Sequence, residues 1–307
     1  MQKHLLVILG PTASGKTKLA IDLATEYNTE ILSADSRQFF KETTIGTAKP
    51  SPLQLGSTRH HFINCLSIHD AYNVGDYELD AIKTLDSIFT KKNIAILSGG
   101  SGLYINAVCN GFDDIPSGDK NIRQALIQQY KQEGIISLQE TLKKLDFNHY
   151  EKMDKSNPHR LIRAIEVCLI TGKPFSAIRQ MDTNTERINK RPFSITKIGL
   201  NLPREELYHR INIRVDKMME DGLLEEVRKL LPFKNLNALN TVGYKEIFAH
   251  LEGECTLVEA IEKIKQNTRN FAKRQLTWWR KDKDITWFDP SDKESILQHI
   301  NIKSIQH

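Results

Sequence analysis

The sequence predicts an α/β protein in which helices flank a parallel β-sheet. Residues 4–9 form a continuous apolar run that stops at Gly10, as buried parallel strands do. Residues 16–27 follow, with apolar side chains recurring on one helical face. Between them, residues 10–17 read G-x-x-x-x-G-K-T. Strand, glycine-rich loop and helix in this order are the setting of a P-loop, so we predict a P-loop NTPase-like sheet.

Three more strands extend this sheet. Residues 30–33 end shortly before Asp35, residues 93–97 end at a run reading Ser-Gly-Gly-Ser-Gly, and residues 194–200 form the last strand. The carboxyl ends of parallel strands lie at one edge of a sheet, and open α/β sheets bind ligands there. We therefore expect the ends of the strands at 30–33 and 93–97 to line one crevice.

An all-helical insert interrupts the predicted core. Between residues 115 and 191 the pattern changes to polar helices rich in Gln and Lys, at 122–134, 137–145 and 158–171. We expect an α/β core made of residues 1–114 and 192–307, and a helical insert domain of residues 115–191. After the last strand, the core continues with a helix at 203–222 and further helices up to residue 283.

The composition is that of a soluble globular protein. The chain has 307 residues, 39% of them hydrophobic, and the apolar run at 5–9 is too short for a signal peptide or a membrane span. Its four cysteines lie far apart without paired spacing, as is typical of reduced thiols in the cytosol. We expect a cytoplasmic monomer with no membrane contact.

Residues 10–17 supply phosphate chemistry. In such a loop, consecutive backbone N–H groups surround phosphate oxygens at a helix N-terminus, a lysine adds positive charge and a hydroxyl binds Mg²⁺. Here Lys16 and Thr17 occupy the last two positions. The predicted diphosphate-binding residues are Gly10, Pro11, Thr12, Ala13, Ser14, Gly15, Lys16 and Thr17.

Asp35 has two interpretations. It follows a strand whose end should face the bound phosphates, where its carboxylate could act as a base; equally, it could be a helix N-cap or loop carboxylate. The sequence has no apolar strand ending in Asp of the kind that motor ATPases use, because the strand at 94–97 ends in Ser-Gly-Gly. This disfavours an energy-transducing function and favours a small-molecule kinase or one of its relatives.

Basic residues are concentrated near the carboxyl end. Residues 263–283 contain eight lysines and arginines against one acid, Asp282, although the net charge of the whole chain is only +5. Lys265, Arg269 and Lys273 recur every four residues on one helical face, which suits a phosphate backbone. Ile264, Phe271 and Trp278 form a separate stripe available for packing.

Several other side chains allow both a functional and a structural role. Trp278 and Trp279 could stack on bases, although core packing is expected for at least one of them. Arg123, Arg160 and Arg163 could close over phosphates as a lid or form a solvated helix face. The pair at 60–61 is an improbable metal site, because adjacent histidines point apart and no Cys or carboxylate cluster completes it.

Motifs along nearly the whole chain resemble the bacterial tRNA dimethylallyltransferase family. They are Gly-Pro-Thr-Ala-Ser-Gly-Lys-Thr at 10–17, Ala-Asp-Ser-Arg-Gln at 34–38, Ile-Gly-Thr-Ala-Lys-Pro at 45–50, Gly-Gly-Ser-Gly-Leu-Tyr at 99–104, Asn-Pro-His-Arg at 157–160, Val-Gly-Tyr at 242–244 and Thr-Arg-Asn-Phe-Ala-Lys-Arg-Gln-Leu-Thr-Trp at 268–278. Three positions depart from the family pattern: Ser101 replaces a usual Thr, Trp279 a common Phe, and Cys65 interrupts the stretch after the histidine pair.

The resemblance implies transfer of a dimethylallyl group from dimethylallyl diphosphate to N6 of the adenosine 3′ to a tRNA anticodon, with release of diphosphate. In that reaction Asp35 is the general base, while Lys16, Arg214 and Thr17 with Mg²⁺ stabilise the leaving diphosphate. The catalytic set is therefore Asp35, Thr17 and Arg214, with Mg²⁺ as cofactor.

The resemblance also implies contacts with the tRNA anticodon stem-loop, whose target base leaves its stack. The implied tRNA-binding residues are Asp35, Ser36, Arg37, Gln38, Ser101, Arg123, His159, Arg160, Leu161, Ile162, Arg163, Thr241, Val242, Gly243, Tyr244, Lys245, Arg269, Lys273 and Arg274.

Two rival functions share part of this pattern. A P-loop small-molecule kinase would use Asp35 on a substrate hydroxyl, but it leaves the basic segment at 263–283 unexplained. A non-enzymatic RNA-binding module would leave the position of Asp35 beside the phosphate-binding loop unexplained.

Overall fold

The chain forms two compact units. The computed structural model describes residues 2–111, 116, 118–182 and 191–305. One unit combines Met1–Cys109 with Arg191–His307, and the other is Asn110–Lys190. We call them the α/β unit and the helical unit.

A six-stranded sheet, entirely parallel, forms the centre of the α/β unit, in the order β3-β2-β4-β1-β5-β6. Its strands are β1 (His4–Leu9), β2 (Ile31–Ser33), β3 (His60–His61), β4 (Ile94–Gly99), β5 (Ser194–Leu200) and β6 (Ile285–Phe288). The four predicted strands and the predicted fold class are confirmed. The edge strands β3 and β6 were not predicted: neither leads into a motif such as the glycine-rich loop after β1 or the Asp35 turn after β2, which marked those strand ends.

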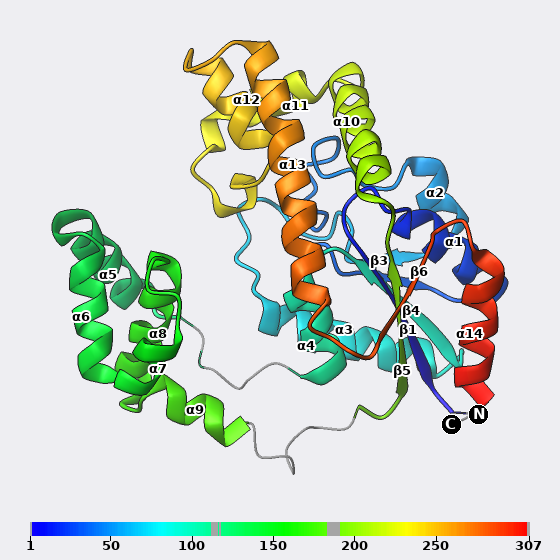
Figure 1. Cartoon of the computed structure of the whole chain (residues 1–307), viewed down its shortest axis with the longest axis horizontal. Helices are drawn as coiled ribbons and strands as arrows, with labels where there is room; N and C mark the ends of the chain where they lie inside the picture. The colour runs from blue at the N-terminus through cyan, green and yellow to red at the C-terminus, as the bar shows by residue number, and fades with distance from the viewer. Residues whose placement is uncertain (1, 112–115, 117, 183–190, 306–307) are drawn as a thin grey trace. The chain divides into compact units, whose positions relative to one another are not determined.

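Helices cover both faces of this sheet (Figure 1). Leu5, Val7 and Leu9 of β1 pack with α3 (Val74–Phe89) and α4 (Gly102–Asn110). Leu6 and Ile8 point to the other face and pack with α1 (Lys16–Glu26) and α14 (Lys293–Ile305). Because successive strand residues alternate between faces, a strand covered on both sides must be apolar throughout, as β1 is.

A second group of helices lies beside the sheet in the α/β unit (Figure 1). It contains α10 (Arg204–Glu220), α11 (Leu223–Leu230), α12 (Tyr244–Leu251) and α13 (Leu257–Trp279), with the 3₁₀ turns Leu231–Phe233 and Asn237–Leu239. These helices share a core with Phe40 and Ile68. The short helix α2 (Pro52–Ser57) follows a capping box made by Ser51 and Gln54.

The packing face predicted for α13 is wrong in part. Ile264 is buried, but Phe271 and Trp278 are 40% and 44% exposed. The residues that pack are Ala260, Ile264, Ala272, Gln275 and Trp279. A straight helix repeats every 3.6 residues, so a strict spacing of seven drifts away from the buried face. The expectation that at least one tryptophan is a core residue is confirmed by Trp279, which is 2% exposed.

The helical unit contains α5 (Lys120–Glu133), α6 (Ile135–Leu145), α7 (Phe147–Lys152), α8 (Pro158–Thr171) and α9 (Phe175–Asp182). The three helices predicted here are confirmed as α5, α6 and α8. Asn157 caps α8 through its side chain and Pro158 occupies the first turn, while Gly172 ends the helix in the left-handed conformation. Leu138, Leu142 and Leu161 lie at the centre of the unit's own core.

Within the described residues, the structure contains no helix with the length and apolar character needed to cross a membrane.

Candidate active site

The P-loop occupies the turn between β1 and α1. A side chain at Gly10 would place its Cβ 2.5 Å from the carbonyl oxygen of Leu200, and φ of Gly10 is 147°, so only glycine fits where β1 passes β5. The Lys16 ammonium donates to the carbonyl oxygen of Pro11 at 2.7 Å. The Lys16 side chain is therefore held against the backbone of its own loop.

A pocket of about 290 Å³ opens at this loop. Its lining combines the P-loop with residues that follow β2 and β4, among them Asp35 and Gly100, and with Arg214 of α10 and Phe271 of α13. The expectation that these strand ends line one crevice is confirmed. We call it the strand-end pocket; its volume suits a small molecule.

Asp35 lines the pocket and is held by its own backbone turn. Its Oδ1 accepts the N–H of Arg37 at 3.1 Å, which is the loop-carboxylate role considered above. Burial raises the pKa of the Asp35 carboxyl, against the Arg37 N–H bond and the charges of Lys16 and Arg214, which lower it. A carboxylate with a raised pKa in a pocket is a candidate general base.

Two cations share the pocket with this carboxylate. Burial, together with the charge of Arg214, lowers the pKa of Lys16 to about 7, although Asp35 acts in the opposite direction. Burial also lowers the pKa of Arg214, and Asp35 again opposes the shift. Arg214 donates to the hydroxyl of Thr12 at 3.2 Å. Two desolvated cations facing one carboxylate favour the binding of an anion.

Gln275 was missed by the sequence interpretation. Its side chain is 6% exposed and bridges two walls of the pocket. The side-chain oxygen accepts the N–H of Thr12 at 2.9 Å, and the amide nitrogen donates to the carbonyl of Gly100 at 2.9 Å. The P-loop is thus fixed to α13 by a residue 263 positions away, and local sequence patterns carry no signal for such a contact.

The donor set at the pocket is compatible with Mg²⁺. Thr17 and Asp35 both line it and offer oxygen atoms, the ligands that this ion prefers. No cluster of three or more His, Cys, Asp or Glu side chains suited to a metal occurs in the part of the chain that the structure describes. An Mg²⁺ ion held by these oxygens would take its other ligands from water and from the phosphates of a bound ligand.

Three neighbours of Asp35 are engaged in the fold. Arg37 donates to the carbonyl oxygens of Asn237 and Ala238. The amide of Gln38 donates to the carbonyl oxygens of the loop that follows β2. Ser36 lies beside Ser101, whose hydroxyl accepts the Ser36 N–H at 3.1 Å. The two serines, implied together by the resemblance, are in direct contact.

The basic residues of α13 differ in their surroundings. Lys265 pairs with Asp216 at 2.8 Å and Glu262 at 3.1 Å. Arg269 donates to the side chain of Asn212. Lys273 and Arg274 are exposed, and Arg274 lies over the ring of Phe271. Free positive charge therefore gathers toward the carboxyl end of the helix.

The segment 241–245 contains both exposed and buried side chains. Tyr244 is fully buried and Lys245 is exposed, while Thr241 and Val242 are intermediate. Gly243 has φ of 97° at the start of α12. Among these residues only Lys245 offers an exposed charge.

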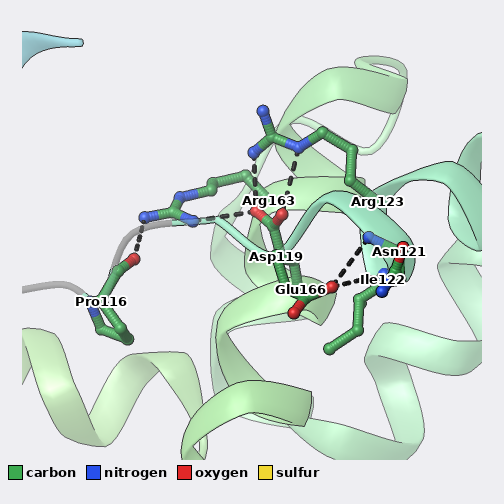
Figure 2. Close-up of polar contacts among 7 residues, drawn as sticks. All are labelled: Pro116, Asp119, Asn121, Ile122, Arg123, Arg163 and Glu166. Carbon is green, nitrogen blue, oxygen red and sulfur yellow. Dashed lines mark hydrogen bonds and ion pairs between the residues drawn. The ribbon is translucent and has the colours of Figure 1, made fainter. Parts of the chain in front are cut away.

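In the helical unit, Glu166 organises two of the arginines implied in tRNA binding (Figure 2). Its carboxylate is fully buried in α8 and receives both Arg123, at 3.1 and 2.6 Å, and Arg163, at 2.9 Å. Arg163 also donates to the carbonyl of Pro116. One acid against two half-exposed arginines leaves a net positive patch.

The first turns of α8, like segment 241–245, contain both exposed and buried side chains. His159 and Arg160 are exposed, whereas Leu161 and Ile162 are 0% and 6% exposed and belong to the core. The side chains of Leu161 and Ile162 are therefore unavailable to a ligand at the surface.

A family model and curated relatives match this chain over most or all of its length. The family model described as IPP transferase matches residues 38–282. A tRNA dimethylallyltransferase of Christiangramia forsetii is 51% identical over 304 residues, covering 99% of each chain. The tRNA dimethylallyltransferase 1 of Phocaeicola vulgatus is 47% identical over 307 residues, covering both chains completely.

Solved structures match over the same length. The tRNA isopentenylpyrophosphate transferase of Bacillus halodurans is similar with a TM-score of 0.70 and 35% identity, covering 99% of this chain and 96% of that one. A eukaryotic dimethylallyltransferase acting on tRNA matches with a TM-score of 0.80 and 26% identity, covering 95% and 75%. With a family model over most of its length and relatives that match end to end, the chain belongs to the IPP transferase family, and the family resemblance drawn from its motifs is confirmed.

Proposed function

We propose that the protein transfers a dimethylallyl group from dimethylallyl diphosphate to N6 of the adenosine 3′ to the anticodon of a tRNA, releasing diphosphate. Given the family to which the chain belongs, one structural observation supports this proposal most strongly. A single pocket contains a P-loop with its lysine, a second partly buried cation in Arg214, and a carboxylate in Asp35 whose pKa is raised.

Asp35 is the general base in this proposal. The lone pair of an exocyclic adenine amine is delocalised, so the amine becomes an effective nucleophile as its proton is removed. The amine nitrogen forms a bond to C1 of the dimethylallyl group, the C1–O bond breaks with its electrons going to the diphosphate, and the Asp35 carboxylate accepts the proton. The raised pKa of Asp35 makes it a better proton acceptor than an exposed aspartate.

The P-loop, Lys16 and Arg214 bind the leaving group. Negative charge grows on the diphosphate oxygen as the C1–O bond breaks, and preorganised cations and N–H groups in a desolvated pocket stabilise that charge most effectively. Residues 10–17 supply the backbone donors and Lys16, and Arg214 adds a charge held beside Thr12. Mg²⁺ bound at Thr17 would neutralise part of the diphosphate charge.

The proposed tRNA contacts fall in both units. In the α/β unit they include the residues around Asp35, Ser101, Lys245, and Lys273 with Arg274; in the helical unit they include His159, Arg160 and the arginines at Glu166. Exposure and positive charge support these positions. We also propose that the chain acts as a monomer, since the P-loop, Asp35 and Arg214 that the proposed reaction uses all line one pocket of a single chain.

The test is incubation of the purified protein with unmodified tRNA, Mg²⁺ and dimethylallyl diphosphate, followed by mass spectrometry of the digested nucleosides. A dimethylallyl mass gain on one adenosine is expected. Asp35→Asn should reduce the rate about 10²–10⁴-fold while tRNA binding persists, since it removes only the base. Asp70→Asn, which alters an exposed loop aspartate outside the pocket, is the matched control.

A parallel reaction with γ-labelled ATP and no prenyl donor distinguishes the kinase alternative. Phosphoryl transfer to a small metabolite, without any gain on tRNA, would contradict the proposal. Wild-type turnover in Asp35→Asn would remove Asp35 from the mechanism.

A further inference from the structure

A carboxylate on α11 holds one wall of the strand-end pocket from outside. Glu226 accepts three consecutive backbone N–H groups, those of Thr44 at 3.0 Å, Ile45 at 2.8 Å and Gly46 at 3.0 Å. It also accepts the hydroxyl of Tyr244 at 2.6 Å. Three consecutive N–H groups that converge on one anion form the kind of concavity that backbone uses to bind phosphates and carboxylates.

These N–H groups belong to a compact loop of residues 43–49, which we call the wall loop. Inside it, the N–H of Ala48 donates to the carbonyl of Ile45, and the Thr47 hydroxyl donates to the carbonyl of Thr43. The carbonyl groups of Thr43 and Ile45 thus accept bonds from inside the loop, while the N–H groups of residues 44–46 donate to Glu226. Ala48 has φ of 49°, an uncommon conformation for a residue other than glycine, so external contacts must hold the loop in this shape.

The wall loop also packs closely against Tyr244 of α12. A Cβ at Gly46 would lie 2.5 Å from the Tyr244 ring, so the loop approaches α12 at a point where only glycine fits. The Tyr244 hydroxyl completes the set of donors around the Glu226 carboxylate. The wall loop, the Tyr244 ring and the Glu226 carboxylate are therefore in direct contact with one another.

The other side of the wall loop faces the strand-end pocket. Thr47 and Ala48 line the pocket together with Pro50 and Ile63. The carbonyl oxygens of Thr47 and Ala48 accept the side-chain amide of Gln38, at 3.2 Å each. Gln38 is three residues from Asp35 and lines the same pocket. A displacement of the wall loop would therefore change the shape of the cavity next to the proposed base.

We propose that Glu226 is a positioning residue that fixes the wall loop and thereby sets the space available to the hydrocarbon part of the prenyl donor. The inference rests on the proposed prenyl-transfer function. Glu226 itself does not line the pocket. Its effect is transmitted through the three N–H groups of the loop.

The chemistry of the contact explains why a carboxylate is needed. One oxygen of Glu226 accepts from Thr44 and Ile45, and the other accepts from Gly46 and Tyr244. A glutamine there has one oxygen and one NH₂ group. In either orientation its NH₂ group faces at least one backbone N–H, so a donor is left unpaired in a partly buried site.

Glu226→Gln should therefore release the wall loop, and Glu225→Gln is the matched control. Glu225 is the preceding residue of the same helix, is exposed, and pairs with Arg228 away from the loop. Hydrogen exchange at residues 44–46 should accelerate about tenfold or more in Glu226→Gln and stay unchanged in Glu225→Gln, because a charge-assisted bond is lost in the first only.

The kinetic measurement is kcat/KM for dimethylallyl diphosphate and for geranyl diphosphate with the same tRNA. In Glu226→Gln the preference for the shorter donor should fall about tenfold, the lower end of what a shaped hydrocarbon pocket supplies, with an increased KM for dimethylallyl diphosphate. A variant that only lowers the amount of folded enzyme would reduce both values equally and leave their ratio unchanged.

The outcomes separate the two proposals. If the wild type and Glu225→Gln do not prenylate tRNA, the proposed function fails. If they do, and Glu226→Gln keeps both its donor ratio and the protection of residues 44–46, Glu226 is not a positioning residue. Should Glu226→Gln fail to fold, wild-type exchange decides: free exchange of these three amides in the donor-free protein would overturn the inference.

Discussion

At the scale of residues, Lys16 and Arg214 are two desolvated cations that share a pocket with one carboxylate, Asp35. The pKa of Lys16 is lowered to about 7, so near neutral pH a substantial share of this side chain is uncharged in the free protein. A bound diphosphate favours the charged form and must raise the pKa of Lys16 again. Binding and protonation are therefore linked.

The first prediction concerns that linkage. Above pH 7, binding of a non-reactive dimethylallyl diphosphate analogue should take up a proton at Lys16, and affinity should fall as pH rises, by at most about tenfold per pH unit. Titration calorimetry at pH 8 in two buffers of different ionisation enthalpy measures the uptake. Lys16→Arg, which stays charged, corrects for protons released by the ligand. Equal uptake in the two proteins would contradict the assignment.

The second prediction concerns Arg214. Arg214→Gln should lower kcat by about 10²–10³-fold, because it removes a donor aimed at the charge of the leaving diphosphate. Arg210→Gln is the control, since Arg210 is one turn earlier on α10, exposed, and paired with Glu206. Single-turnover rates of nucleoside modification provide the measurement. A change confined to the KM for the donor would indicate ground-state binding only.

Sequence reasoning gave the residues proposed to react, but not the residues that hold them in place. Residues 10–17 follow a motif whose spacing is fixed by phosphate geometry, and Asp35 follows a strand whose end must face that site, so both could be predicted. Arg214 came only from the family resemblance, because a single arginine on a helix has no pattern of its own. Gln275 contacts Thr12 from 263 positions away and Glu226 contacts Thr44 from 182 positions away, and no local period encodes contacts of this range.

At the scale of elements, α13 has one face in the core and another carrying cations of unequal availability. Lys265 is paired with two acids, whereas no carboxylate pairs with Lys273 anywhere in the described part of the chain. The two lysines lie two turns apart on one helix, so they test whether a charge must be unpaired to contribute to RNA binding.

The third prediction follows from this difference. Lys273→Ala should reduce the slope of log affinity for tRNA against log salt by roughly 0.7–0.9, the value for one lost phosphate contact, and Lys265→Ala should reduce it by less than half of that. Affinities measured by filter binding between about 50 and 200 mM salt give the slope. Equal slopes in the two variants would mean that the pairing of Lys265 is broken in the complex.

The fourth prediction concerns the contact between the ends of β2 and β4. A Cβ at Gly99 would lie 2.2 Å from the Ala34 carbonyl oxygen. Gly99→Ala should cost about 1–3 kcal/mol of unfolding free energy and reduce turnover, because Ala34 precedes Asp35. Gly56→Ala is the control: its Cβ would meet nothing within 4 Å, and α2 should be stabilised by roughly 0.5–1 kcal/mol. Denaturant unfolding measures both.

Long periodic elements were predictable, whereas the two edge strands of the sheet were not. The helix at 158–171 was predicted with the bounds that α8 has, because Asn157, Pro158 and Gly172 mark both of its ends. β3 and β6 depend on neighbouring strands for their conformation. For α13, the period of seven misplaced Phe271, which lines the pocket instead of packing in the core.

At the scale of the whole molecule, the two units have separate cores and separate spectroscopic signals. All three tryptophans, at 278, 279 and 287, belong to the α/β unit. Fluorescence therefore reports on that unit, while hydrogen exchange in α8 reports on the helical unit. In the helical unit, the buried Glu166 carboxylate holds two arginines, so its removal should change hydrogen exchange in α8.

The fifth prediction uses this separation. Glu166→Ala should destabilise the helical unit by about 1–3 kcal/mol, because two half-exposed arginines lose their charge-assisted hydrogen bonds to the Glu166 carboxylate. Exchange in α8 should accelerate while the fluorescence transition of the α/β unit stays in place. Glu140→Ala, an exposed acid on α6, should change neither by more than about 0.5 kcal/mol. A fluorescence transition that shifts together with α8 exchange would mean that the units unfold cooperatively.

The parallel pairing of β1 with β4 on one side and β5 on the other has a consequence for biosynthesis. β4 ends at Gly99, and β5 begins only at Ser194. At a translation rate of about 5–20 residues per second, the ribosome needs roughly 5–20 s to make the intervening chain. During that interval the apolar strand β1 has an unpaired edge, a template for aggregation. We therefore expect the nascent chain to pass through an aggregation-prone stage that lasts until β5 emerges, and slower translation of residues 100–193 to lower the soluble yield.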